Sequence, residues 1–111
     1  MTKCVDEDTH FRILRLLEEA PKSSQREISN VLGISLGGVN FCLKALVEKG
    51  HIKTRNFRAS NNKLRYAYIL TPSGISAKTA LTGRFLKRKM AEYEVLKVEI
   101  ARLKGKKGLY D

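Results

Sequence analysis

The segment from residue 24 to residue 50 constrains the fold most, because it must place two helices against each other at a sharp corner. Ser24 and Glu27 have the spacing of a capping box, in which each side chain satisfies a backbone N–H at the start of a helix. Gly33 can adopt the left-handed backbone that ends this helix, and Ser35 is a favourable N-cap for the next one. Two helices joined by a few residues that include a glycine form a helix-turn-helix motif.

Apolar residues at helical spacing predict one helix before this motif. They also indicate how far the second helix of the motif extends. Thr9–Glu19 has apolar residues at three- and four-residue steps, acidic residues near its start and Pro21 after its end. The helix that follows Ser35 extends to Lys49 and is closed by Gly50. We expect the apolar residues of the two helices to form the core: Phe11, Ile13, Leu14, Leu16, Leu17, Val39, Leu43, Leu46 and Val47.

After residue 50 the apolar period changes from helical to alternating, which predicts a β-hairpin. Its strands are Ile52–Phe57 and Tyr66–Leu70, and its tip is Arg58–Lys63, where residues that tolerate turns gather. The segment Lys53–Arg65 holds five basic residues and no acidic one. The hairpin is therefore predicted to be a positively charged wing.

A last helix is predicted to begin with Thr71 as its N-cap and Pro72 at its first position, where a missing N–H costs nothing. The helical pattern runs to about Leu103, with a potential break at Gly83. We expect residues 105–111, rich in glycine and lysine, to form a flexible basic tail.

This last helix carries an apolar seam at coiled-coil a and d positions, formed by Leu86, Tyr93, Leu96, Ile100 and Leu103. On that register Glu92 and Glu99 occupy g positions while Lys97 and Lys104 occupy e positions, so a parallel pair of helices sets opposite charges together. Because the seam is short, we expect Leu14, Leu17 or Phe85 to add contacts to the same interface. The alternative is that the seam folds back on its own domain.

Taken together, these elements predict a mainly α fold with a small β-hairpin wing. With 111 residues, the chain suits one compact domain with an appendage and excludes a multi-domain enzyme. We expect a winged helix-turn-helix domain over residues 1–71, a long C-terminal dimerisation helix over residues 72–104, and the tail over residues 105–111.

The net charge of +11 is confined to the second half of the chain. Residues 1–50 hold seven basic and seven acidic residues, whereas residues 51–111 hold fifteen and four. Such asymmetry favours a polyanionic partner, and nucleic acid before a membrane, because a basic surface releases counterions from phosphates. The alternative is a surface that only keeps the protein soluble.

Other compartments and chemistries find little support in the sequence. The chain has no apolar run long enough to cross a bilayer, and acidic residues follow its start, so we expect a cytoplasmic protein with no membrane partner. Cys4 and Cys42 are too few to staple a scaffold. His10 and His51 have no ligand at metal-binding spacing. We therefore expect no enzyme activity, no cofactor and no metal, and we expect Cys42 to be a small buried residue rather than a redox switch.

Several segments resemble one family. The pattern of a turn, a recognition helix and a wing is carried by Leu32-Gly33-Ile34-Ser35, Val39, Leu43, Leu46, Glu48-Lys49-Gly50, Ile52 and Leu70-Thr71-Pro72-Ser73-Gly74. It resembles the MarR-type winged helix-turn-helix regulators. Residues 38–46, 55–58 and 84–93 are similar to the small MarR-family regulators associated with exopolysaccharide (EPS) gene clusters. The resemblance implies a bacterial, homodimeric, DNA-binding transcriptional regulator.

The chain departs from the larger family at two points. Phe41 stands where many relatives have an arginine on the recognition helix, which argues against a direct guanine contact at that position. The chain is also short for a complete dimerisation domain, which argues against a small-molecule effector.

Candidate DNA-binding residues lie at the start of the two motif helices and on the wing. Asn40 can pair with adenine through two hydrogen bonds, and Lys44 is placed to hold a phosphate. Gly37 and Gly38 either allow close approach to a phosphate or merely loosen the helix. The complete set is Ser24, Ser35, Leu36, Gly37, Gly38, Asn40, Phe41, Lys44, Arg55, Arg58, Lys63 and Arg65.

The function expected from these features is sequence-specific binding of double-stranded DNA by a homodimer, at a pseudo-palindromic operator, with repression of transcription as the outcome. The alternative is a winged-helix module that binds other proteins and contacts nucleic acid only without sequence preference.

Overall fold

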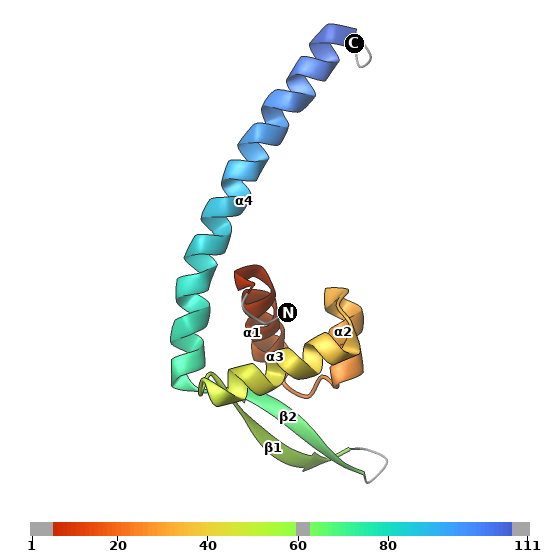
Figure 1. Cartoon of the computed structure of the whole chain (residues 1–111), viewed down its shortest axis with the longest axis vertical. Coiled ribbons are helices and arrows are strands. Elements are labelled where there is room, and N and C mark those ends of the chain that lie inside the picture. The colour runs from red at the N-terminus through yellow and green to blue at the C-terminus, as the bar shows by residue number, and fades with distance from the viewer. Residues whose placement is uncertain (1–5, 60–62, 108–111) are drawn as a thin grey trace.

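The computed structural model describes residues 6–59 and 63–107 (Figure 1). Their elements follow in the order α1 (Glu7–Glu19), α2 (Gln25–Leu32), α3 (Leu36–Glu48), β1 (Ile52–Arg58), β2 (Leu64–Leu70) and α4 (Pro72–Lys107). The predicted fold class, mainly α with a β-hairpin wing and a long last helix, is confirmed.

The helix ends are set by local side-chain hydrogen bonds. Ser24 and Glu27 form the predicted capping box, and Ser35 Oγ accepts from the backbone N–H of Gly38 at 3.0 Å. Gly33 has the left-handed φ of 71° that the corner between α2 and α3 requires. The first helix starts two residues earlier than predicted, because the carboxylate of Asp6 caps it.

The core lies where α1, α2 and α3 meet the base of the hairpin. Its fully buried side chains are Ile13, Leu14, Leu17, Ile28, Val39, Leu43, Leu46 and Ile52. Val47 was expected there and is 41% exposed, because it follows Leu46 by about 100° around α3 and so falls beyond the edge of the buried stripe. Cys42 is buried and carries a free thiol, as expected of a small core residue.

The hairpin pairs β1 with β2 in an antiparallel register from Ile52 opposite Leu70 to Arg58 opposite Leu64. The other edge of β2 is held to the loop between α1 and α2, since the backbone N–H of Tyr68 donates to the carbonyl of Pro21 at 3.0 Å. The predicted tip lies partly outside the described residues.

The last helix, α4, has 36 residues and continues through Gly83 without a break. Thr71 caps it as predicted, its Oγ1 accepting from the N–H of Gly74 at 3.0 Å. The helix includes residues 105–107, which were expected in the tail; lysine is a good helix former, and one glycine costs only about 1 kcal/mol. Figure 1 shows α4 passing α1 and then extending away from the rest of the molecule.

The foot of α4 is joined tightly to the end of α3. The backbone N–H of Thr71 donates to the carbonyl of His51 at 3.0 Å, and the Thr71 hydroxyl donates to the carbonyl of Gly50. A Cβ at Gly74 would lie 1.9 Å from the carbonyl oxygen of His51. Only glycine therefore allows the first turn of α4 to lie this close to the start of the wing.

Candidate nucleic-acid interface

The N-terminal half of α3 presents an open surface. Leu36 and Phe41 are 42% and 50% exposed, although both are large apolar residues. Apart from Gly37 itself, its two chain neighbours and the adjoining backbone of α3, no atom of the described chain lies within 4 Å of where a Cβ of Gly37 would be, so close packing does not require this glycine. Gly38 differs, because its Cβ would lie 3.1 Å from the capping hydroxyl of Ser35. The first turn of α3 is thus both well capped and accessible from outside.

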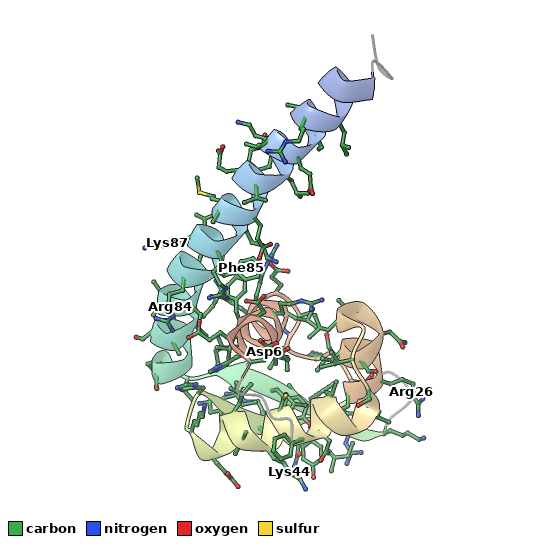
Figure 2. The ribbon with its side chains drawn as sticks, turned by 45° about the horizontal axis from the view of Figure 1, so that its top comes forward. Asp6, Arg26, Lys44, Arg84, Phe85 and Lys87 are labelled. Carbon is green, nitrogen blue, oxygen red and sulfur yellow. The ribbon has the colours of Figure 1, made fainter. Side chains whose placement is uncertain are left out.

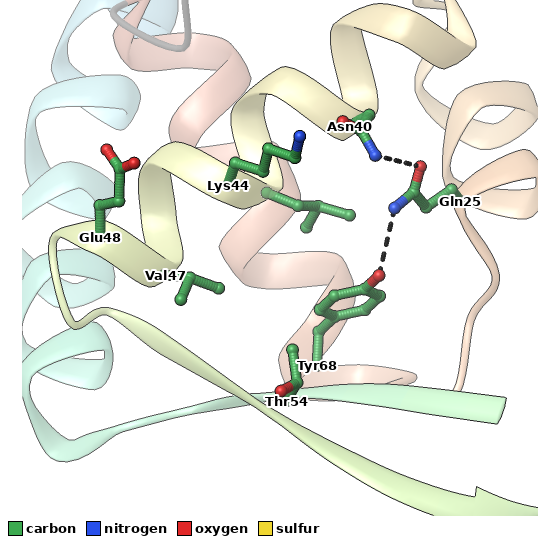
Figure 3. A pocket seen from close by; sticks show the side chains of 8 residues that line it. Gln25, Asn40, Lys44, Val47, Glu48, Thr54 and Tyr68 are labelled. Carbon is green, nitrogen blue, oxygen red and sulfur yellow. Dashed lines mark hydrogen bonds between the residues drawn. The ribbon is translucent and has the colours of Figure 1, made fainter.

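Asn40, the candidate base reader, is held in a chain of hydrogen bonds (Figure 3). Its Nδ2 donates to Oε1 of Gln25 at 3.3 Å, and Nε2 of Gln25 donates to the hydroxyl of Tyr68 at 3.1 Å. These residues line an open groove of about 350 Å³ between α3 and the wing, which Lys44 and Thr54 also line. The chain links α3, the first residue of α2 and strand β2.

The start of α2 adds a second polar groove, of about 270 Å³, lined by Ser24, Arg65 and three neighbours. The Ser24 hydroxyl accepts from the N–H of Glu27 at 3.0 Å, as the capping box requires. The N-terminal end of a helix carries a partial positive charge. Arg65 adds a positive charge to this groove, while the carboxylate of Glu27 accepts from the backbone N–H of Ser24 at 2.8 Å at the same helix end.

The basic residues of the wing are exposed, but they do not share one face. The strand register places Arg55 and Arg65 on the same face as Phe57, whereas Arg58 lies on the opposite face with Tyr66. Phe57 is half-buried, and Nζ of Lys22 lies 4.9 Å from its ring centroid, which agrees with a packing role. Lys63 follows the tip and is exposed.

The apolar seam of α4 is not covered by its own domain. Leu86, Tyr93, Leu96, Ile100 and Leu103 are each between 52% and 58% exposed. The alternative, that the seam folds back, is therefore wrong for the described chain. Two residues expected to add to this interface are elsewhere: Leu14 and Leu17 are buried in the core. They belong instead to the core cluster that includes Ile28, Val39 and Leu43.

Phe85, the third residue expected to add to the interface, is half-buried between α4 and α1. Its ring centroid lies 4.7 Å from that of Phe11. Figure 2 shows Phe85 on the side of α4 that faces α1, while Lys87 points away from the domain. Phe85 thus fastens the helix to its own domain.

The fold brings together two histidines that are distant in sequence. Nδ1 of His51 lies 3.3 Å from Nε2 of His10, and their rings are stacked. Burial, with smaller contributions from Lys49 and His51, lowers the pKa of His10 to about 4, and burial also lowers the pKa of His51. Among residues 6–59 and 63–107, no three His, Cys, Asp or Glu side chains are grouped as ligands for a metal ion.

In the part of the chain that the structure describes, no single helix is long and apolar enough to cross a membrane. Helices α2 and α3 are long and apolar enough only when they are counted together, and the chain bends by 110° between them.

The capped corner between α2 and α3, followed by a basic hairpin, defines the winged helix-turn-helix class. Residues 6–53 match the family described as winged helix-turn-helix DNA-binding. No curated protein matches the chain by sequence. The N-terminal part of the chain therefore has the winged helix-turn-helix fold.

Solved structures give the more particular likeness. A MarR/EmrR family transcriptional regulator from Acinetobacter sp. ADP1 is 27% identical, over 88% of this chain and 73% of that one, with a TM-score of 0.61. A transcriptional regulator homologue from Pyrococcus horikoshii OT3 is 22% identical, over 84% and 87%, with a TM-score of 0.56. A mutant of MepR from Staphylococcus aureus, bound to an oligodeoxyribonucleotide, is 19% identical, over 92% and 78%, with a TM-score of 0.58. The chain has the MarR-type fold.

The sequence alone did not single out two residues of this interface. Gln25 lies between the two capping-box residues and Tyr68 lies in the second predicted strand, and neither position indicates a contact with Asn40. Both hold Asn40 through contacts that span 15 and 43 residues. The only available signal was an amide at the first position of α2, which is too common to predict such a link.

Proposed function

We propose that this chain is a sequence-specific, double-stranded DNA-binding transcriptional regulator of the MarR family, and that it acts as a homodimer in the cytoplasm. The observation that carries the proposal is that α3 and the basic wing lie together at one end of the molecule, while the outer part of α4 extends away from it (Figure 1). Lys44 extends from α3 away from the core (Figure 2). The sequence resemblance favours the small EPS-associated branch.

Within this proposal each part of the interface has a separate role. The first turns of α3, with Asn40 as base reader, enter the major groove. Lys44 and the start of α2 at Ser24 hold phosphates, because cations and helix N-termini attract anions. The wing residues Arg55, Arg58, Lys63 and Arg65 contact the flanking backbone. Ser35, Leu36, Gly37, Gly38 and Phe41 complete the surface that approaches the DNA.

The long axis of the molecule favours a parallel dimer. The chain extends over 60 Å along its longest axis, with the wing at one end and the outer part of α4 at the other. A parallel pairing of the α4 seams sets both DNA-binding ends on the same side, where two recognition helices can reach half-sites about 34 to 36 Å apart. An antiparallel pairing would set them at opposite ends. Such a dimer represses most simply by occluding a promoter.

The test is a selection from randomised duplex DNA, followed by affinity measurements at physiological salt. A regulator should enrich a pseudo-palindromic site and bind it about 1,000-fold or more tightly than a scrambled duplex of the same length. If no site is enriched and all duplexes bind alike, the proposal is wrong, and the wing serves only charge-driven contact as in a protein-interaction module.

The role of Lys44 has a test of its own. Lys44→Ala should weaken binding to the selected and scrambled duplexes alike, and reduce the slope of log affinity against log salt by about one, because one phosphate contact is lost. Lys87→Ala is the matched control, since Lys87 is also exposed but points away from the domain on α4. An unchanged slope for Lys44→Ala would remove this residue from the phosphate contacts.

A further inference from the structure

The hydrogen-bonded chain from Asn40 through Gln25 to Tyr68 joins the three elements of the interface. Gln25 is its centre, because it accepts from Asn40 on α3 and donates to Tyr68 on β2. All three side chains are partly buried, and they line the groove between α3 and the wing, with Gln25 between Asn40 and Tyr68 (Figure 3). Gln25 is therefore fixed at both ends of its amide.

This arrangement leaves the base-reading edge of Asn40 available. A side-chain amide has two N–H donors and one carbonyl oxygen, and pairing with adenine uses one N–H and the oxygen. Asn40 gives one N–H to Gln25, so one N–H and Oδ1 remain, and they form the edge that pairs with adenine when the N–H given to Gln25 is the one trans to Oδ1. The bond to Gln25 also fixes the rotation of the amide before DNA arrives.

Such fixing matters because an amide can present either its oxygen or its nitrogen to a given atom of a base. An Asn side chain that rotates freely would lose rotamer freedom on binding and could meet the wrong base with its edge reversed. Gln25 disfavours the reversed orientation of the Asn40 amide. Reversal would place Oδ1 of Asn40 against Oε1 of Gln25, and two acceptor oxygens repel each other. Tyr68 keeps Oε1 in place by accepting from the other end of the same amide.

We propose that Gln25 and Tyr68 are positioning residues that set which base pair Asn40 reads, and that they transmit the position of the wing to the recognition helix. The inference rests on the proposed DNA-binding function. It extends that function to residues whose side chains reach the base only through Asn40.

A purely structural role would have a different signature. The three side chains are only partly buried and line an open groove, which the core residue Leu43 also lines; the ring of Tyr68 packs against the core while its hydroxyl bonds Gln25. Loss of a partly exposed hydrogen bond changes stability little when water can replace the partner. The informative quantity is therefore base discrimination at one position of the site, not the melting temperature or the overall affinity.

The experiment uses the full chain and the duplex enriched by the wild-type protein, together with every single base-pair variant of that duplex. Asn40→Ala first identifies the position that Asn40 reads, where discrimination should fall by about 5- to 100-fold. Gln25→Met keeps the length of the side chain but removes its amide. It should reduce discrimination at that same position severalfold, and leave the other positions and the scrambled duplex unchanged.

Three further variants sharpen the result. Tyr68→Phe keeps the ring and should cause a smaller loss at the same position. Gln25→Glu should restore discrimination, because a carboxylate accepts both from Asn40 and from the Tyr68 hydroxyl, although its charge weakens binding to every duplex. Asn30→Met is the control, since it removes an exposed amide from the same helix.

The outcomes separate this inference from the function on which it rests. If a site is enriched but Gln25→Met keeps full discrimination at the Asn40 position, or if Asn40→Ala loses discrimination nowhere, the positioning role is wrong while the DNA-binding function stands. Equal losses at all positions would also overturn it. If no duplex is enriched, the proposed function fails and this inference fails with it.

Discussion

The two halves of α4 share one continuous helix but have opposite surroundings. In the inner half, residues 72–88, Leu81 is only 5% exposed and Phe85 packs on Phe11. Arg84 and Arg88 form hydrogen-bonded ion pairs with Glu7, and Arg88 also pairs with Asp8. In the outer half, every residue from 89 to 105 is exposed.

The difference favours a different partner for each half of α4. The inner half is completed by α1 of its own chain. The outer half carries Tyr93 and Ile100 with more than half of their surface exposed, and an isolated helix of this length is marginal in water. Apolar residues repeated at a and d positions without cover in their own chain favour pairing with the same seam of a second copy. The ion pairs at its surface, such as Lys89 with Glu92, contribute little by themselves.

The largest effect is expected from a charge in the outer seam. Ile100→Asp should convert dimers to monomers, because it sets two carboxylates into the paired stripe, and should weaken binding to the operator by about 100-fold or more as the second half-site is lost. Sedimentation and DNA affinity measure both. Val95→Asp is the control, since Val95 is also more than half exposed but lies about 140° around the helix from Ile100. A dimer that survives Ile100→Asp would show that the outer seam is not the interface.

A substitution in the inner half should act on folding instead. Leu81→Ala removes a buried side chain and should lower the free energy of unfolding by about 2 to 5 kcal/mol. Leu86→Ala, one turn further along but more than half exposed, should cost the domain much less. Urea unfolding compares them, best in the Ile100→Asp background, where dimerisation no longer contributes. Equal losses from the two variants would contradict the division of α4 proposed here.

The histidine pair beside the inner half predicts a dependence of stability on pH. The pKa of His10 is lowered to about 4 in the folded protein, against about 6.5 in the unfolded chain. The unfolded state therefore binds more protons between these values, and stability is complete above pH 6.5 and falls as the pH drops toward 4, by on the order of 3 kcal/mol. The surrounding charged groups are Glu7, Lys49 and Arg84, and His51 acts with the same sign.

Thermal unfolding across this pH range measures the effect. His10→Gln stays neutral throughout, so its stability should change less between pH 6.5 and pH 4 than that of the wild-type protein. The remaining slope should come from His51 and the acidic residues. A wild-type slope that His10→Gln leaves intact would show that His10 titrates normally.

The smallest effect on stability is expected from a cysteine that reports the direction of pairing. In a variant with both native cysteines replaced, Leu103→Cys should form an intermolecular disulfide on mild oxidation, because a parallel register sets position 103 against itself. Val98→Cys is the control, because residue 98 lies about 140° around α4 from residue 103. An intact dimer without the Leu103 cross-link would exclude the parallel arrangement.

The parts of this structure that could be predicted depend on short-range signals. The capping box at Ser24 and Glu27, the left-handed Gly33 and the cap at Thr71 each involve about four consecutive residues, whose hydrogen bonds hardly depend on the rest of the fold. They determined the order of the helices and the wing. The same signals placed the candidate interface at the start of α3.

What could not be predicted depends on which surfaces meet. The stripe with Leu14 and Leu17 and the stripe with Tyr93 and Ile100 have the same apolar spacing, and periodicity cannot tell that the first is covered within the chain. The contacts of Gln25 with Tyr68 and of His10 with His51 span more than 40 residues. They arise only when the hairpin packs beside the helices.

Because Gly74 has no side chain, α4 starts close to the wing, and the angle at which it starts sets the position of its far end. With 36 residues at 1.5 Å each, α4 is about 54 Å long, so a tilt of about 5° at its foot moves its far end by about 5 Å. In a dimer joined at the far ends of α4, the same tilt would shift the two recognition helices relative to the pitch of the double helix. The close contact of Gly74 with the carbonyl of His51 thus fixes the distance between the two recognition helices.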